Sequence, residues 1–334
     1  MARPSLAAGS LALVVVAMAG GAAALDRPDA ATLLSDLGFS SGQVDRVRSG
    51  SIVSARIEPS SERELVVAFA FRMARTPTEL IAQMRAGLID RMVLDTNVHL
   101  LGVGAPTLAS FAPLTLGLDA QKGAQTYANA QPGRDLNLSR AEIARFDALR
   151  GSPLSAVEHA LRGALLERLQ AYQARGLAGI DPYARSDGAL RSAGDELRSA
   201  TLATKPLHAL LTAVLPVLLD YPAHKPPGTE EAYGWTQDDA HGVPTFSLMH
   251  SLAVPAGGAW VVARRQFYVS NRYNCAQSIA GYLPMQGGTL VIYTHRTSTD
   301  GVTGFGADMK RGIGSRLLAR RLEDLYGRIQ ASVQ

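Results

Sequence analysis

The chain has 334 residues, of which 47% are hydrophobic and 19% charged, and this balance is typical of a globular protein rather than a disordered one. Cys275 is its only cysteine, which excludes an internal disulfide and favours a small buried thiol. The formal net charge is +4. The part of the chain from Trp260 onwards has ten basic and four acidic residues, which is a net charge of +6. In an exported protein this excess argues against nucleic acid. It favours anionic lipid, a cell-wall polymer or an acidic ligand, with an ordinary basic surface as the alternative.

The first residues have the order of a secretory signal peptide. Arg3 precedes an uncharged apolar stretch that runs to Met18, and small residues up to Ala24 come before the first acid, Asp26. We therefore expect residues 1–24 to be removed by cleavage near Ala24 and the mature protein to be periplasmic or secreted. A retained N-terminal anchor is the alternative.

The segment after the leader predicts a β-hairpin followed by a helix. Two strand-like runs, residues 51–58 and 64–73, flank the turn-like sequence "PSSER". A helix is expected to begin at Pro77, because Thr76 and Glu79 form a capping box around it.

The middle of the chain is predicted to be helical. Ser152 and Pro153 open a stretch whose leucines recur at helical spacing as far as Gly176, a residue suited to a helix C-terminus. A second helical stretch is expected over about residues 189–219, with a break near Pro206.

Four strand candidates follow a Pro-rich connector, and connections of hairpin length separate them. They are residues 244–252, 259–270, 273–283 and 288–296. A basic amphipathic helix over residues 315–330 comes last. The pattern therefore predicts an α+β fold: an antiparallel β-sheet meander with a long C-terminal helix, a helical middle segment and an N-terminal hairpin and helix.

These signals divide the chain into four parts, with the alternative that everything after the leader is one domain. The parts are the signal peptide (1–24), an N-terminal α+β part (25–150), a helical segment (151–222) and the sheet with its helix (223–334).

Five glycines lie between the last predicted strand and the terminal helix, and they do not form a nucleotide-binding loop. The order G-F-G-A-D-M lacks the third glycine of G-x-G-x-x-G, and no P-loop frame fits. Gly312 and Gly314 would each cost about 1 kcal/mol inside a helix relative to alanine. Either the helix begins near Ser315, or the glycines permit a close approach to another backbone.

Candidate ligand-binding residues are polar or aromatic side chains on the predicted strands and beside them. His250 alternates with apolar residues, so it is either an ordinary core histidine or a polar point that orients a ligand in an apolar cavity. Alternate residues from Trp260 to Tyr268 would share a face that mixes aromatic and polar groups. The predicted ligand-binding residues are Trp235, His250, Tyr268, Tyr273, Arg296 and Asp300.

Neither an enzyme signature nor a cofactor motif is found. The hydrolase motifs G-x-S-x-G and S-x-x-K are missing. Four residues are still of types that could serve an envelope-acting hydrolase, namely His295, Asp300, Tyr268 and Tyr273. Five residues could supply metal ligands, but their spacing matches no zinc pattern: Asp238, Asp239, His241, His250 and His295. We therefore predict no catalytic residue, no metal and no cofactor.

Three motifs carry a resemblance to known proteins: "YGWTQDDAHGVPTFSLMHSL", "FYVSNRYNCAQSIAGYL" and "GGTLVIYTHRTSTDGVTGFG". With them, residues 176–325 resemble the C-terminal part of a group of bacterial exported proteins of unassigned function, which implies no activity. The order of strands and helix is also similar to the helix-grip (START-like) fold. That resemblance implies a sheet that grips a long C-terminal helix around an apolar cavity.

The sequence thus favours an exported, non-catalytic binding protein that holds an apolar or lipid-like ligand between the sheet and the terminal helix. The alternatives are an envelope-acting hydrolase and a structural or scaffold protein of the cell envelope. The expected partners are that small molecule and, through the basic C-terminal helix, an anionic membrane surface, with no nucleic acid.

Overall fold

The computed structural model describes residues 30–333 except 56, 89–96, 102–103, 118, 134, 205–211, 213, 240–242 and 305. The predicted signal peptide and His241 therefore lie outside the described residues.

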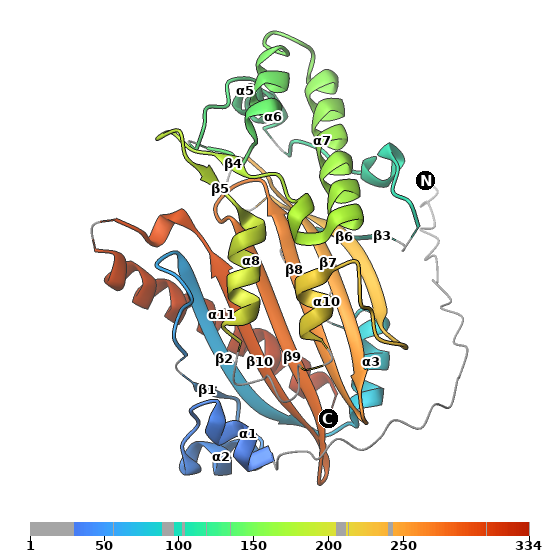
Figure 1. The fold of residues 1–334 in the computed structure, drawn as a ribbon, viewed down its shortest axis with the longest axis vertical. Helices are drawn as coiled ribbons and strands as arrows, with labels where there is room; N and C mark the ends of the chain where they lie inside the picture. Colours follow the sequence, from blue (N-terminus) through green and yellow to red (C-terminus); the bar gives the residue numbers. More distant parts are fainter. Residues whose placement is uncertain are drawn as a thin grey trace, which may run out of the picture.

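An eight-stranded antiparallel sheet forms the centre of the molecule, with the strand order β1-β2-β10-β9-β8-β7-β6-β3 (Figure 1). The strands are β1 Val53–Ala55, β2 Glu64–Met73, β3 Asn97–Leu101, β6 Glu230–Asp238, β7 Thr245–Ala256, β8 Ala259–Val269, β9 Cys275–Met285 and β10 Gly288–Ser298. The strands from β6 to β10 pair in chain order and form the predicted meander. The α+β fold class is therefore confirmed.

The N-terminal strands complete the two edges of this sheet. β1 and β2 form the predicted hairpin, and β2 then pairs along its whole length with β10. β3 pairs with β6 at the opposite edge. The early strands thus add to the meander, and a separate two-stranded ribbon forms from β4 (Tyr183–Ala184) and β5 (Leu190–Arg191).

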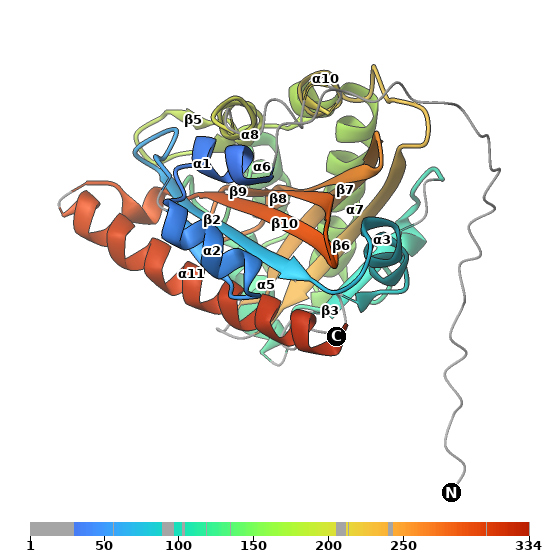
Figure 2. The same cartoon turned by 90° about the horizontal axis from the view of Figure 1, so that it is seen from below.

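Helices pack on both faces of the sheet (Figure 2). One face, called face 1 here, contacts helices of the N-terminal and middle parts, which are α1 Ala30–Asp36, α2 Ser41–Arg48, α7 Leu154–Arg175, α8 Ala193–Leu202 and α10 Leu215–Asp220. Around α7 lie α5 (Ala120–Ala128) and α6 (Arg140–Asp147). Face 2 contacts α3 (Pro77–Arg85) and the terminal helix α11 (Ala307–Ser332).

The predicted helix starts are confirmed at α3 but not at α11. Thr76 accepts from the amide of Glu79, whose side chain returns to the Thr76 amide, so the capping box is complete. The prediction that the terminal helix begins near Ser315 is wrong, since α11 begins at Ala307 and includes both inner glycines. A Cβ at Gly314 would lie 2.9 Å from a methyl carbon of Leu65, so this glycine permits the close approach, whereas Gly312 faces open space.

One strand departs from the predicted alternation. The register between β7 and β8 shifts at Leu248 and Met249, which pair with Tyr268 and Gln266, so that Phe267 is an extra residue. A bulge of this kind moves the following side chain to the other face. The prediction that Tyr268 shares a face with Trp260 is therefore wrong: Tyr268 packs under α7 on face 1.

The end of α7 requires a glycine, and this positions the segment that follows α10. Gly176 has a φ of 56°, and a Cβ there would lie 1.9 Å from the carbonyl oxygen of Tyr221. Only a residue without a side chain fits this contact. Gly176 thus brings Tyr221 against the base of α7, beside β6.

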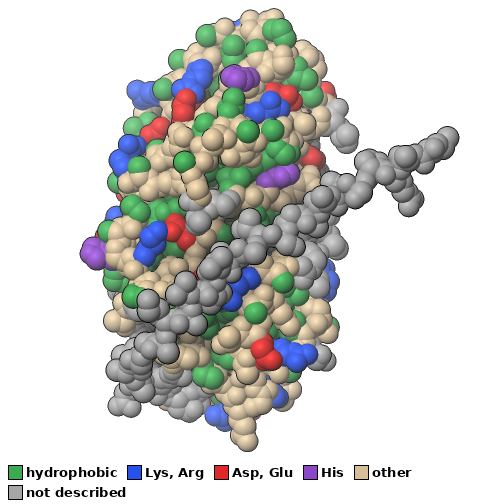
Figure 3. Space-filling view, turned by 90° about the vertical axis from the view of Figure 1, so that its right-hand side faces the viewer, with side chains coloured by type: hydrophobic (Ala, Val, Ile, Leu, Met, Phe, Trp, Pro, Cys, Tyr) green, Lys and Arg blue, Asp and Glu red, His purple; other side chains and the backbone are tan. Residues whose placement is uncertain are grey.

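The side of the molecule that carries the β6–β3 edge has a mixed surface. Basic and acidic side chains lie intermixed with hydrophobic ones in the view of Figure 3, without a broad field of one sign. Any recognition on this side must therefore depend on a local arrangement of groups.

Candidate functional site

A row of buried polar side chains crosses face 1 of the sheet. Residues paired directly across antiparallel strands present their side chains on the same face. The register of the sheet aligns five such residues from β6 to β10, all at most 4% exposed: Tyr233, His250, Arg265, Gln277 and Arg296. Burying so many polar groups is costly unless each is hydrogen-bonded. We therefore expect a binding or catalytic site along this row, because function is a common reason for burying polar side chains.

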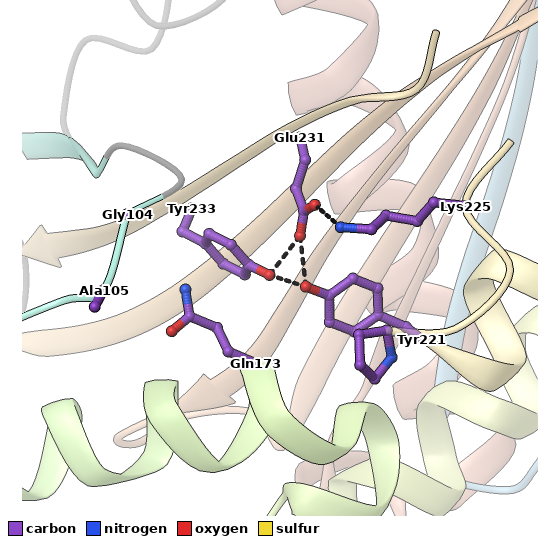
Figure 4. A pocket seen from close by; sticks show the side chains of 8 residues that line it. Gly104, Ala105, Gln173, Tyr221, Lys225, Glu231 and Tyr233 are labelled. Carbon is purple, nitrogen blue, oxygen red and sulfur yellow. Dashed lines mark hydrogen bonds and ion pairs between the residues drawn. The ribbon is translucent and has the colours of Figure 1, made fainter. Parts of the chain in front are cut away.

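The row ends at an open cavity of about 390 Å³ beside β6 (Figure 4). Its lining residues come from the loop after β3, from α7, from the segment after α10 and from β6. They are Gly104, Ala105, Gln173, Tyr221, Pro222, Lys225, Glu231 and Tyr233. The cavity has the size of a small-molecule site, and its functional groups are polar.

Glu231, in the wall of this cavity, is the residue on which the hydrogen bonds of the other lining residues converge. The hydroxyls of Tyr221 and Tyr233 each donate to its Oε1 at 2.5 Å, and they also contact one another. Lys225 Nζ donates to Oε2 at 2.5 Å. The carboxylate side chain is only 10% exposed, whereas that of Lys225 is 40% exposed. Figure 4 shows the two rings and the lysine converging on the carboxylate.

His250 connects Glu231 to the covering helix α7. Its Nε2 lies 3.2 Å from Glu231 Oε1, although without full hydrogen-bond geometry, and its Nδ1 is 2.8 Å from the hydroxyl of Tyr172. An ionised carboxylate only accepts, so the proton of a neutral imidazole belongs on Nε2 and Nδ1 accepts from Tyr172. His250 therefore lies on the buried side of Glu231, with its Nε2 proton directed at the carboxylate, and is only 1% exposed.

The charges of this cluster are constant near neutral pH. Burial alone would raise the pKa of Glu231, but His250 and the hydrogen bonds that the carboxylate accepts outweigh it and hold the pKa well below its usual range. Burial lowers the pKa of His250, which is therefore neutral. Burial and the adjacent carboxylate raise the pKa values of Tyr221 and Tyr233. The cavity thus holds a fixed negative charge, which two neutral hydroxyls position and the ammonium group of Lys225 neutralises.

Of the six predicted ligand-binding residues, His250 belongs to this cluster. Trp235 is buried farther along β6, where it stacks on His99 at 4.0 Å and donates to the carbonyl oxygen of Ser110. Tyr268 is buried beneath Arg168, whose guanidinium lies 4.4 Å from the ring centre.

The other predicted residues occupy different places. The Tyr273 hydroxyl donates to Gln266, which neighbours Arg265 in β8 and so points to face 2. Arg296 stands at the far end of the buried row, pairs with Glu64 at 2.6 Å and lines a second cavity of about 220 Å³. Asp300, just after β10, is surrounded by three arginines, Arg63, Arg185 and Arg191.

The residues suggested for a hydrolase are not brought together either. His295 contacts Tyr293 and Thr297 of its own strand, whereas Asp300 contacts the three arginines. His295 points to face 2, since its neighbour Arg296 points to face 1, and Tyr268 lies on face 1. Across the ranges that the structure describes, no group of three or more His, Cys, Asp or Glu side chains could hold a metal ion; His241 is outside these ranges.

Sequence reasoning missed most of the cavity. It treated residues 221–235 as a Pro-rich connector and did not predict β6, so Glu231 and Tyr233 were not placed on a common face. The alternation E-x-Y at residues 231–233 was the available signal. Tyr221 and Lys225 carry no such signal, because the chain fold alone brings them to β6.

The chain was also compared with known proteins. No family model matches it, and neither a curated protein nor a solved structure matches it significantly. The resemblances to exported proteins and to the helix-grip fold stay predictions. None of the helices in the described part of the chain is long and apolar enough to span a membrane.

Proposed function

We propose that the protein is an exported, non-catalytic binding protein whose ligand is a small molecule with an ammonium group held by Glu231. Export rests on the signal-like leader. The ligand class rests on the one observation that carries the proposal: Glu231 is an ionised carboxylate at the wall of an open cavity, held by the hydroxyls of two tyrosines, and the ring of Tyr221 faces the cation that it binds. Carboxylates and aromatic faces together are favourable surroundings for a cation.

Lys225 is positioned as such a ligand would be. Its Nζ lies 2.5 Å from Glu231 Oε2 and 5.6 Å from the centre of the Tyr221 ring. The lysine comes from an irregular segment between α10 and β6, and its side chain is 40% exposed. Its ammonium group can therefore turn into water when an external ammonium group takes its place at Glu231, whose own side chain is only 10% exposed. The side chain acts as an internal stand-in that an external ammonium group displaces.

The protonation states favour binding over acid–base catalysis. An effective general base has a pKa near the working pH. The pKa of Glu231 is held far below that range, and those of Tyr221 and Tyr233 are raised above their usual value. Near neutral pH, Glu231 therefore stays ionised and both tyrosines stay protonated. Such a site is suited to binding a fixed positive charge.

This ligand differs from the apolar one expected from the sequence. Buried aromatic side chains occupy the interface between the sheet and α11, where Tyr326 packs against Phe71 at 5.1 Å and Tyr293 at 4.8 Å. The cavity at Glu231 instead offers a carboxylate, an ammonium group, an amide and two hydroxyls. A small polar ligand is therefore the better match.

Isothermal titration calorimetry with four probes tests the proposal: n-butylammonium, n-butanol, n-butyrate and n-decanoate. We expect butylammonium to bind and the matched butanol and butyrate not to bind. Glu231→Gln should weaken butylammonium binding at least tenfold, because a hydrogen bond to a charged group contributes about 1.5–3 kcal/mol. Lys225→Ala should tighten it by about fivefold or more, because the internal competitor for a largely buried carboxylate is removed.

Lys122→Ala is the matched control, since Lys122 is an exposed lysine on α5. It removes the same charge from the protein and should leave the affinity unchanged. Weaker binding in Lys225→Ala would mean that the lysine belongs to the ligand site rather than competing for it. Binding of decanoate that is insensitive to Glu231→Gln would overturn the ammonium proposal and favour the apolar ligand.

A further inference from the structure

The terminal helix α11 carries apolar side chains on two opposite sides. Its inner side packs into the core on face 2, through Leu318, Leu322, Leu325, Tyr326 and Ile329. Its outer side exposes a second set, here called the outer stripe: Met309 at 71%, Ile313 at 45% and Leu317 at 62%. Residues four apart lie on one side of a helix, so these three form a continuous line about 12 Å long.

The outer stripe is a concentration of exposed apolar surface rather than a chance scatter. Large exposed hydrophobic side chains elsewhere in the described ranges are Leu100, Leu190 and Leu202, on three different elements. Single exposed residues of that kind are ordinary, whereas a clustered set marks an interaction surface. The stripe lies on the N-terminal half of α11. Figure 2 shows that this helix runs outside the sheet, along one of its faces.

Basic side chains flank the stripe on both sides. At 100° per residue, Arg316 and Arg320 come to one side of the line and Lys310 comes to the other, while Arg321, four residues after Leu317, continues the line at its end. All four are exposed. The helix as a whole carries six basic and three acidic side chains, and one of the acids, Asp308, is paired with Arg311. An apolar line with cationic groups on both sides and at its end is complementary to a surface that is anionic outside and apolar beneath.

We propose that the outer stripe of α11 docks the protein on an anionic phospholipid bilayer, with the helix lying in the plane of the membrane surface. Met309, Ile313 and Leu317 enter the boundary between headgroups and acyl chains, while the flanking basic groups contact lipid phosphates. Each Lys or Arg near such a surface adds about fivefold to the partition coefficient. The cavity at Glu231 lies on the other face of the sheet and stays open to solution. This proposal is independent of the ligand proposed for that cavity.

Vesicle co-sedimentation of the whole protein tests the proposal, with vesicles of phosphatidylcholine alone and of phosphatidylcholine with phosphatidylglycerol at equal amounts. We expect binding to the anionic vesicles that weakens as NaCl is raised, since salt screens the charges. The pair Arg316→Gln and Arg320→Gln should lower the partition coefficient by about 30-fold. The pair Ile313→Gln and Leu317→Gln should lower it at least tenfold.

Matched controls come from other exposed positions. Arg46→Gln with Arg48→Gln removes two exposed arginines from α2, and Leu190→Gln removes an exposed leucine from β5. Both controls should bind vesicles as the parent protein does. Equal binding to neutral vesicles, or no loss in the α11 variants, would overturn the proposal. So would a dimer in sedimentation velocity that Ile313→Gln with Leu317→Gln dissociates, because the stripe would then cover a second copy of the chain.

Discussion

Glu231 and Asp300 are two carboxylates of one sheet with opposite surroundings. Asp300 has three guanidinium partners, with Arg63 Nε and Arg191 Nε each 3.1 Å from Oδ1 and Arg185 Nε 2.9 Å from Oδ2. Arg185 is itself tied to the side-chain oxygens of two asparagines at 3.0 and 2.9 Å. Glu231 has a single cationic side chain, Lys225, and two neutral hydroxyl donors.

The difference lies in whether the cation can be replaced. Around Asp300, Arg185 is also anchored by two asparagines, and Arg63 and Arg191 share the same carboxylate, so Asp300 neutralises part of a structural cluster. Around Glu231 the tyrosines hold the carboxylate in place without neutralising it, and the half-exposed lysine can withdraw. A carboxylate therefore becomes a candidate binding group when neutral donors fix its position and its counter-ion is mobile.

The largest effect that separates the two carboxylates is on stability. Asp300→Asn should lower the free energy of unfolding by about 2 kcal/mol, because three clustered guanidinium groups lose their common anion; the value is below that of a fully buried pair since Asp300 is one-third exposed. Glu231→Gln should cost about 1 kcal/mol or less, because the amide oxygen still accepts from both tyrosines.

Urea denaturation measures both changes. Asp308→Asn is the control for Asp300, since the Asp308 side chain is 97% exposed, and its transition midpoint should equal that of the parent. Equal losses from Asp300→Asn and Glu231→Gln would contradict the distinction between a structural carboxylate and a binding one.

A smaller effect on stability is expected at the two inner glycines of α11, one of which packs against Leu65 while the other meets open space. Gly312→Ala should raise the free energy of unfolding by about 1 kcal/mol, because alanine favours the helix and its methyl group meets open space. Gly314→Ala should gain the same stabilisation from helix preference, but the steric clash of its methyl group with Leu65 should cancel or exceed that gain. The free energy of unfolding should therefore stay unchanged or fall. Thermal unfolding of both variants decides this; stabilisation by both would mean that Leu65 moves aside freely.

The smallest expected effect is that of pH on ligand binding. A lowered carboxyl pKa shifts the loss of negative charge to more acid solution, and a lowered histidine pKa keeps His250 neutral there. The affinity of Glu231 for butylammonium should therefore change less than about threefold between about pH 8 and 5. Calorimetry at several pH values checks this. A loss of affinity with a midpoint near pH 6.5 would indicate that His250 gains a proton and opposes the ligand.

Much of the architecture could be predicted from local pattern. The strands β7 to β10 alternate or form apolar runs between short turns, and Thr76, Pro77 and Glu79 mark a helix start that the structure confirms. The predicted start of the terminal helix near Ser315 failed, because tertiary contacts override local preference there. Glycine disfavours a helix interior, yet Gly312 and Gly314 lie inside α11 because its C-terminal half packs firmly on the sheet.

The sequence by itself determined the α+β class, the meander and the basic terminal helix, because these depend on the periodicity of neighbouring residues. Only the tertiary structure decided the site. Glu231 joins Tyr221, Lys225 and His250 across β6, β7 and the end of α10, and Gly176 sets that approach by leaving room for the Tyr221 carbonyl. A cluster of this kind depends on register and close packing between distant segments, which no local periodicity records.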